Sequence, residues 1–304
     1  MLTQDNPYYQ QVVLLLDVLP IVGQETCFAL KGGTAINLFV RDLPRLSVDI
    51  DLTYLPVQDR TTSLREVGSA LERVAISIEG KWPTVRVDRN AAEGQVAKLV
   101  VWRDHARVKI EVSPVLRGCV REAAIRGVTS TVEAQFGYTE ASVVHLQDLY
   151  AGKLCAALDR QHPRDLFDVH QLLKNEGLDE GLIEVFVVYL LSSNRALAEM
   201  LSPNLQPIAV TFEEQFRGMA LTPVTVDELE YTRKTMLTLI HEGLTKRQRN
   251  FLLSFKQGEP DWGLLSVQDV EHLPAVQWKL QNIRSMTPTK RVQAVERLRH
   301  VLFG

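Results

Sequence analysis

The stretch KGGTAINLFVRDLPRLSVDIDL, residues 31–52, joins a glycine pair to two aspartates that lie in an otherwise apolar run. Asp49 and Asp51 are separated by a single isoleucine. A carboxylate among apolar groups is destabilising unless a cation or hydrogen bonds compensate its charge. The sequence therefore raises the question of what compensates these two carboxylates.

The segment SVDIDLTYL alternates with period two and predicts a strand. Asp49 and Asp51 then project from one face, and Ile50 and Leu52 from the other. Two carboxylates about 6–7 Å apart along a strand are well placed to share a divalent ion. The alternative, and the usual meaning of an isolated D-x-D, is a solvated strand face near a turn.

The KGGT turn, residues 31–34, stands between a strand-like segment and a helix-like one, residues 34–43, for which Thr34 is the predicted N-cap. Gly32 and Gly33 allow close approach of a ligand to the backbone, and the N–H groups that open the helix favour an anion. Many strand-to-helix connections need glycine without binding anything. The segment is not a Walker loop, because G-x-x-x-x-G-K-[ST] is absent.

A third carboxylate lies in ARVKIEVSPV, residues 106–115. Alternation there places Glu111 on the polar face of a strand that could lie beside the D-x-D strand. An exposed edge-strand glutamate is the equally weighted alternative.

Periodicity divides the chain into an N-terminal α/β domain, residues 1–144, and an all-helical C-terminal domain, residues 145–304. The expected class is α+β with a mixed sheet in the first domain. Predicted helices and strands of the first domain are helices 8–22, 34–43 and 64–80, and strands 27–32, 47–55, 84–90, 95–102 and 106–115. Predicted helices of the second domain are 146–160, 163–175, 179–193, 225–244, 245–257, 266–283 and 288–303.

The composition is that of a globular protein, with 304 residues, 45% hydrophobic residues and a formal net charge of −3. Any nucleic acid must therefore meet a local basic patch. Three widely spaced cysteines argue against a disulfide framework or a zinc site. No secretory signal is evident, and the longest apolar run, residues 183–191, is too short for a membrane span. We expect a soluble cytoplasmic protein that does not contact a membrane.

A second group of charges lies in AGKLCAALDRQHPRDLFD, residues 151–168. Helical spacing places Lys153 in an apolar stripe, where it needs an anionic partner or a route to water. Asp165 and Asp168 follow one turn apart. Either these residues form a structural salt-bridge cluster, or Lys153 and Asp165 belong to an active site.

Together, residues 31–52 and 151–168 resemble the polymerase-β-like nucleotidyltransferase superfold and, more specifically, the AbiEii/AbiGii family of nucleotidyltransferase toxins. The resemblance reaches to about His170. It implies transfer of NMP from an NTP to an acceptor hydroxyl with release of pyrophosphate, by a toxin of a toxin–antitoxin or phage-defence system. Transfer to a protein or small molecule, or an inactive scaffold that binds nucleotide or a partner, are the alternatives.

The resemblance also implies site roles. Mg²⁺, or Mn²⁺ in its place, would be held by Asp49, Asp51 and Glu111. The catalytic residues would be Asp49, Asp51, Lys153 and Asp165. The nucleotide-binding residues would be Lys31, Gly32, Gly33, Thr34, Arg45 and Ser47; for Arg45 and Ser47, capping of a turn is the alternative.

The implied partners are an NTP, a cognate antitoxin and an RNA acceptor, namely the 3′ end of tRNA. Two basic clusters of the helical domain could contact an RNA backbone, although solvated helix faces explain them equally well. Their cations are Lys246, Arg247 and Arg249, and Lys290, Arg291, Arg297 and Arg299.

Overall fold

The computed structural model describes residues 8–92 and 94–304. It divides into two compact units. The first takes the described residues up to His145 together with Met219–Thr222, and the second takes Leu146–Gly218 and Pro223–Gly304. The first unit contains a seven-stranded mixed sheet with helices, and the second is built from helices and loops, which confirms the α+β class.

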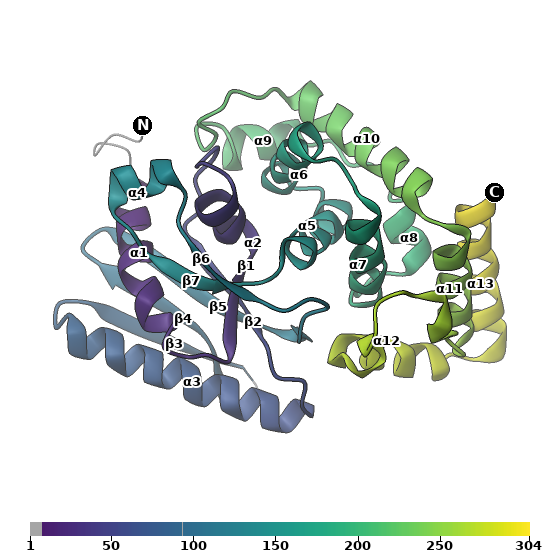
Figure 1. Cartoon of the computed structure of the whole chain (residues 1–304), viewed down its shortest axis with the longest axis horizontal. Coiled ribbons are helices and arrows are strands. Elements are labelled where there is room, and N and C mark those ends of the chain that lie inside the picture. The colour runs from purple at the N-terminus through teal and green to yellow at the C-terminus, as the bar shows by residue number, and fades with distance from the viewer. Residues whose placement is uncertain (1–7, 93) are drawn as a thin grey trace. The chain divides into compact units, whose positions relative to one another are not determined.

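The sheet of the first unit has the strand order β3-β4-β5-β2-β1-β7-β6 (Figure 1). β2 pairs antiparallel with β1 and parallel with β5. The strand bounds are β1 Phe28–Lys31, β2 Asp49–Tyr54, β3 Arg86–Ala92, β4 Gln95–Arg103, β5 Ala106–Arg117, β6 Ala124–Gly127 and β7 Glu140–Val143. The strand that carries Glu111 therefore does lie beside the D-x-D strand, as predicted.

One face of this sheet is apolar and covered by two helices, α1 (Tyr9–Val22) and α3 (Arg60–Lys81), which pack on it and on each other (Figure 1). Ile50 and Leu52 of β2 point to this face and are 0% and 1% exposed. Burial of their side chains contributes roughly 1.5–3 kcal/mol each. Because side chains alternate, fixing these two residues inward forces the two aspartates to the opposite, polar face.

The helix after β1 differs from the prediction. It begins at Gly32, with Lys31 rather than Thr34 as its N-cap, and runs through α2 (Gly32–Thr34) into the π-helix η1 (Ala35–Val40). Thr34 is not a cap, because its hydroxyl donates to the backbone oxygen of Asp49 instead. A π-helical stretch of this kind is frequent at functional sites.

Three elements of the first unit were not predicted from the sequence, namely β6, α4 (Ser130–Phe136) and β7. They are short, and β6 is exposed along much of its length, so no apolar alternation marks it. The return of residues 219–222 to this unit was also unforeseen. There the N–H of Leu46 donates to the Met219 oxygen at 2.9 Å, and the N–H of Leu221 donates to the Pro44 oxygen at 2.8 Å.

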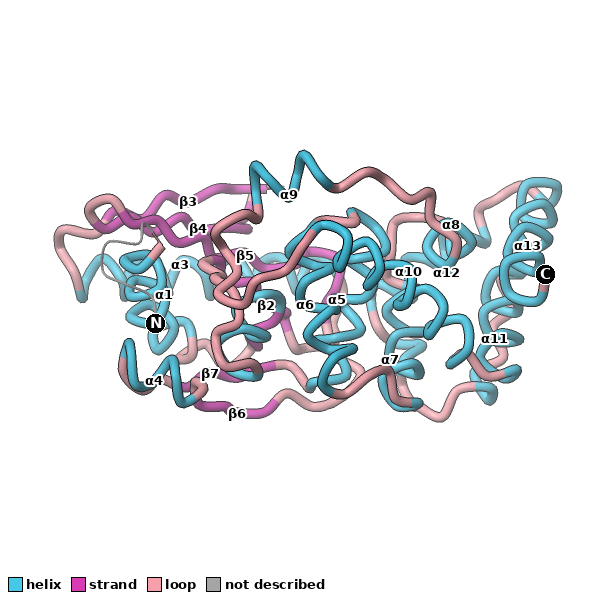
Figure 2. Tube along the Cα trace, turned by 90° about the horizontal axis from the view of Figure 1, so that it is seen from above, coloured by secondary structure: helices cyan, strands magenta, loops and turns pink. Residues whose placement is uncertain are grey.

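The regular elements of the second unit are all helices, and loops join them (Figure 2). Its helices are α5 Leu146–Arg160, α6 Pro163–Asn175, α7 Glu180–Leu191, α8 Leu197–Leu201, α9 Ala209–Gln215, α10 Val226–Gly243, α11 Lys246–Gln257, η2 Trp262–Leu264, η3 Val270–His272, α12 Pro274–Arg284 and α13 Pro288–Phe303. The single helix predicted over residues 266–283 is wrong, because Pro274 starts a new helix there. Capping boxes at Thr225 and Thr245 fix the starts of α10 and α11.

The centre of the second unit is α7, in which every residue from Leu182 to Leu191 is buried. A helix that is apolar on all sides must be enclosed by other elements, and α5, α10, α11 and α12 pack around it. Among residues 8–92 and 94–304, none of the helices combines the length and apolar character needed to span a bilayer.

Candidate active site

Charged side chains form a row across the polar face of the sheet. Asp51 of β2 stands opposite Lys31 of β1 and beside Glu111 of β5, which in turn faces Lys98 of β4. Cross-strand neighbours have Cβ atoms about 4.5–5.5 Å apart. The two acidic residues at the centre of the row are therefore flanked by a lysine on each side.

Lys109 compensates the carboxylates from the same face. Its ammonium nitrogen lies 2.9 Å from Glu111 Oε2 and 3.9 Å from Asp49 Oδ2. The hydrogen bond from Lys109 holds the pKa of Glu111 below its ordinary value. Burial opposes the charge of Lys109, but Glu111 and Asp49 outweigh it and raise the lysine's pKa. Lys109, with Lys31, thus answers the question raised by the D-x-D segment.

Lys31 is the more enclosed of the two lysines. Burial lowers its pKa, and the nearby carboxylate of Asp51 opposes that effect. A desolvated ammonium of this kind is stabilised by further negative charge. Lys31 is therefore suited to a polyanionic ligand.

The glycine pair is in direct contact with the acidic segment. Gly32 has φ +73°, and a Cβ there would lie 2.7 Å from Asp51 Oδ2. A Cβ at Gly33 would lie 2.6 Å from Arg45 Nη2 and 2.8 Å from Ser47 Oγ. Real Cβ atoms do not approach so closely, so only glycine fits at either position without displacing these groups.

Thr34 and Arg45 are enclosed by the protein. The Thr34 hydroxyl is 1% exposed and lies 3.1 Å from Ser47 Oγ, in addition to its bond to the Asp49 backbone. Arg45 is 2% exposed and donates from Nη1 to the Leu46 oxygen at 2.8 Å. Their packing holds the glycine turn against the acidic strand.

The structure thus brings together all six predicted nucleotide-binding residues and the two aspartates. Lys31, Gly32, Gly33 and Ser47 are half-buried, so their atoms are the ones open to a ligand. Asp49 is 41% exposed on the same face as Asp51. Two carboxylates with room for water and phosphate oxygens fit the coordination that Mg²⁺ prefers. Glu111 fits less directly, because its carboxylate is bound to Lys109.

Lys153, Asp165 and Asp168 form a separate buried cluster within the second unit. The Lys153 ammonium lies 2.9 Å from Asp165 Oδ1 and 3.0 Å from Asp168 Oδ2. The three side chains are 6%, 1% and 0% exposed. Arg160 adds a second cation, with Nη2 2.9 Å from Asp165 Oδ1.

The sequence of the loop explains this cluster. α5 ends at Arg160, and Pro163 opens α6 with His162 as its N-cap, so Asp165 falls in the first turn of α6. A carboxylate there also interacts favourably with the helix macrodipole. Burial opposes ionisation of Asp165, but Lys153 and Arg160 outweigh it and hold its pKa well below the usual range. The cluster has the geometry of a salt-bridge network.

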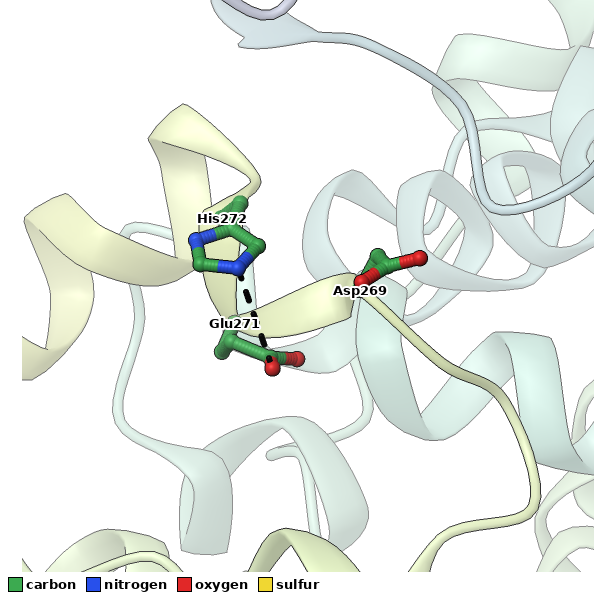
Figure 3. Close-up of side chains that lie close together, drawn as sticks. All are labelled: Asp269, Glu271 and His272. Carbon is green, nitrogen blue, oxygen red and sulfur yellow. Dashed lines mark ion pairs between the residues drawn. The ribbon is translucent and has the colours of Figure 1, made fainter.

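One further group has the ligand types of a metal site. Side-chain ligand atoms of Asp269, Glu271 and His272 lie within 4.8 Å of one another (Figure 3). His272 Nε2 is 3.9 Å from Glu271 Oε1, and both Asp269 and His272 are exposed. Solvated side chains at a turn account for this arrangement, so we assign no metal to it.

The sequence reasoning missed Lys109 and Lys98. Alternation places Lys109 on the same face of β5 as Glu111, and it places Lys98 on the same face of β4 as Val100. This alternation was a usable signal in the sequence. What the sequence could not show was that Lys109 also reaches Asp49, since that depends on the register between β2 and β5.

Comparisons with known proteins agree with this fold. The family model described as nucleotidyl transferase AbiEii toxin, type IV toxin–antitoxin system, matches residues 13–282. The solved structure of MenT4, a nucleotidyltransferase toxin from Mycobacterium tuberculosis H37Rv, superposes with a TM-score of 0.63 at 16% identity, covering 92% of this chain and 94% of that one. A search of curated proteins found no match. Because the family model spans most of the sequence, the chain belongs to the AbiEii family of nucleotidyltransferase toxins.

Proposed function

We propose that this nucleotidyltransferase transfers NMP from an NTP to an RNA hydroxyl, and that the row of charges around Asp49 and Asp51 is its active site. One observation carries the proposal. The glycine turn packs directly against both the second aspartate and the Arg45–Ser47 segment, so the residues suited to phosphate and those suited to metal form one surface.

In this proposal the backbone N–H groups of the glycine turn and the Ser47 hydroxyl bind the triphosphate, and Lys31 neutralises part of its charge. Asp49 and Asp51 hold the divalent ion. A bound Mg²⁺ or Mn²⁺ supplies charge neutralisation on the phosphates and activation of the acceptor hydroxyl. Glu111 joins the ligand set only where Lys109 releases it.

Lys153 and Asp165 are also proposed to contribute to the transfer reaction. Asp165 and Asp168 hold the Lys153 ammonium in a fixed position. A fixed cation is the kind of group that stabilises charge on a transferring phosphoryl group. Their support is the buried network together with family membership.

The proposed acceptor is the 3′ end of tRNA, and membership of a type IV toxin–antitoxin family supports a cognate antitoxin as partner. Transfer to a protein or small molecule, or nucleotide binding without transfer, are the competing functions. No particular contact in the structure favours any of these competing functions.

The test is to incubate the protein with each α-labelled NTP, total RNA and Mg²⁺, beside the Asp51→Asn variant. Label in RNA that depends on Asp51 supports the proposal. Label only in protein or in a small molecule contradicts the RNA acceptor, and binding of NTP without any labelled product supports the inactive scaffold.

A further inference from the structure

A second row crosses the same polar face beside the carboxylates. Arg86 of β3 stands opposite Trp102 of β4, and Trp102 stands opposite Arg107 of β5. The guanidinium carbons of Arg86 and Arg107 lie 5.1 Å and 5.5 Å from the centroid of the indole ring. We call these three residues the arginine–tryptophan row.

The ring is held in a fixed orientation. Trp102 Nε1 donates to Asp88 Oδ2 at 2.8 Å, and Arg86 Nε lies 3.1 Å from Asp88 Oδ1. Arg86 nonetheless remains 68% exposed. Arg107 is exposed as well, and no carboxylate of residues 8–92 or 94–304 forms an ion pair with it. The row therefore offers two solvent-facing guanidiniums and one compensating carboxylate.

The register places this row close to the active site. Arg107 precedes by two residues Lys109, the direct neighbour of Asp49 on β5. With a rise of about 3.3 Å per residue and strands about 4.8 Å apart, the Cα atoms of Arg107 and Asp49 are about 8 Å apart, and those of Trp102 and Asp49 about 12 Å apart. Side chains at both positions share the face of the two aspartates.

We propose that the arginine–tryptophan row binds the acceptor, as a single-stranded polynucleotide whose terminal hydroxyl then lies at Asp49 and Asp51. Guanidiniums match phosphate oxygens bidentately, and aromatic or guanidinium planes stack on bases without regard to sequence. A row that carries both groups on a rigid sheet suits a strand end. The inference rests on the proposed function, because it takes these aspartates as the site of transfer.

Two of the cations predicted earlier for this role, Arg247 and Arg249, are less suited to it. Arg249 donates to the backbone oxygens of Leu244, His241 and Leu302, and Arg247 donates to the Gly263 oxygen. These guanidiniums are occupied by carbonyl groups within the second unit. They stabilise helix ends and leave fewer donors for phosphate.

The chain supplies a matched control for Arg107. Lys81, the last residue of α3, is also exposed and lies over an indole ring, 4.6 Å from the centroid of Trp82. It belongs to the helix that covers the opposite face of the sheet. Charge reversal at Lys81 therefore changes the net charge by as much as charge reversal at Arg107 does, and it also removes a cation–aromatic contact. It leaves the polar face of the sheet unaltered.

The experiment measures binding of a fluorescent single-stranded RNA and of a DNA of the same sequence, without NTP, by anisotropy across a range of salt. Arg107→Glu should weaken binding at least about tenfold and reduce the log–log salt slope by about 0.7 per lost phosphate contact. Lys81→Glu should bind nearly as wild type. Equal loss of DNA and RNA binding indicates recognition of backbone and bases, and a loss confined to RNA indicates that the 2′-hydroxyl is also recognised.

A second readout uses the intrinsic fluorescence of Trp102. Quenching of tryptophan emission by the RNA should be lost in Trp102→Phe and retained in Trp82→Phe. The proposal is overturned if the wild-type protein binds neither strand, if Arg107→Glu binds as wild type, or if Lys81→Glu loses as much. Labelling of RNA by Arg107→Glu at the wild-type rate overturns this inference and leaves the proposed function standing. Strand binding by the row without any transfer overturns the proposed function, and of this inference it leaves only the strand contact.

Discussion

Lys31 and Asp51 face each other across β1 and β2, and the residue after Lys31 is the glycine whose Cβ would strike the Asp51 carboxylate. The Asp51 side chain is therefore positioned by Lys31 on one side and by the backbone of Gly32 on another. This relationship ties the glycine turn to the acidic strand. The contributions of Lys31, Gly32 and Asp51 can therefore be tested by separate substitutions.

Asp49→Asn and Asp51→Asn should each lower nucleotidyl transfer by more than about 100-fold, since even outer groups of a metal site cost 10–100-fold. Both aspartates are partly exposed, and each change removes a negative charge from a crowded acidic group, so stability should be kept. Transfer rate and urea denaturation measure the two effects. Near-normal turnover by either variant in Mg²⁺ would show that the aspartate is not a metal ligand.

Gly32→Ala should reduce both stability and transfer. The positive φ alone costs roughly 1–2 kcal/mol for a side chain, and the clash with Asp51 adds to it. Gly177→Ala is the control, because Gly177 has φ +77° and nothing within 4 Å of an added Cβ. If the two variants lose the same stability, and Gly32→Ala retains activity, the close approach to Asp51 has no functional weight.

Lys153→Met should lower the free energy of unfolding by about 3–5 kcal/mol, since it leaves two buried carboxylates without their shared ammonium. Urea denaturation measures this loss. Arg160→Met, the control, removes an exposed cation from Asp165 while Lys153 remains, and should lower the free energy of unfolding less. Unchanged stability with reduced transfer in Lys153→Met would instead favour a direct role on the phosphates.

Asp165 should make stability depend on pH in the acidic range. Because its pKa in the folded state is below the ordinary value of 3.8, its contribution is present above that pH and is lost as the pH falls through the folded-state pKa. Asp165→Asn should therefore be less stable than wild type at neutral pH, and the gap should narrow as the pH falls below 3.8. A gap that is constant down to pH 2 would contradict the assignment.

Arg249→Gln should destabilise the second unit by about 1–3 kcal/mol, because three backbone carbonyls lose a charged donor. Lys246→Gln removes a neighbouring exposed cation and should be nearly neutral. Thermal unfolding compares the two. Equal stability with a selective loss of RNA binding in Arg249→Gln would restore the basic cluster as an RNA contact.

Local patterns predicted those parts of the site that one strand determines. Alternation alone placed Asp49 and Asp51 on one face and Ile50 on the other, and the same rule placed Glu111 on the polar face of its own strand. These predictions succeeded because the period of a strand is a property of the backbone.

Features that depend on distant segments escaped prediction. The register that brings Lys109 to Asp49 arises from pairing between two strands that are far apart in sequence. The packing of Arg45 against Gly33 is likewise a tertiary contact, between a loop residue and the glycine turn. Thr34 was mistaken for an N-cap because its bond to the Asp49 backbone is a tertiary contact. The sequence shows these residue types, but it does not show which residues they contact.

The return of residues 219–222 to the first unit has a consequence for dissecting the protein genetically. A gene fragment that stops at His145 encodes every strand of the sheet but omits the segment that bonds to Pro44 and Leu46, the neighbours of Arg45. Such a fragment leaves those backbone groups open beside the Ser47–Asp51 stretch. The first unit is thus not a contiguous module of the gene, and recombination or truncation after His145 separates it from a piece of its own fold.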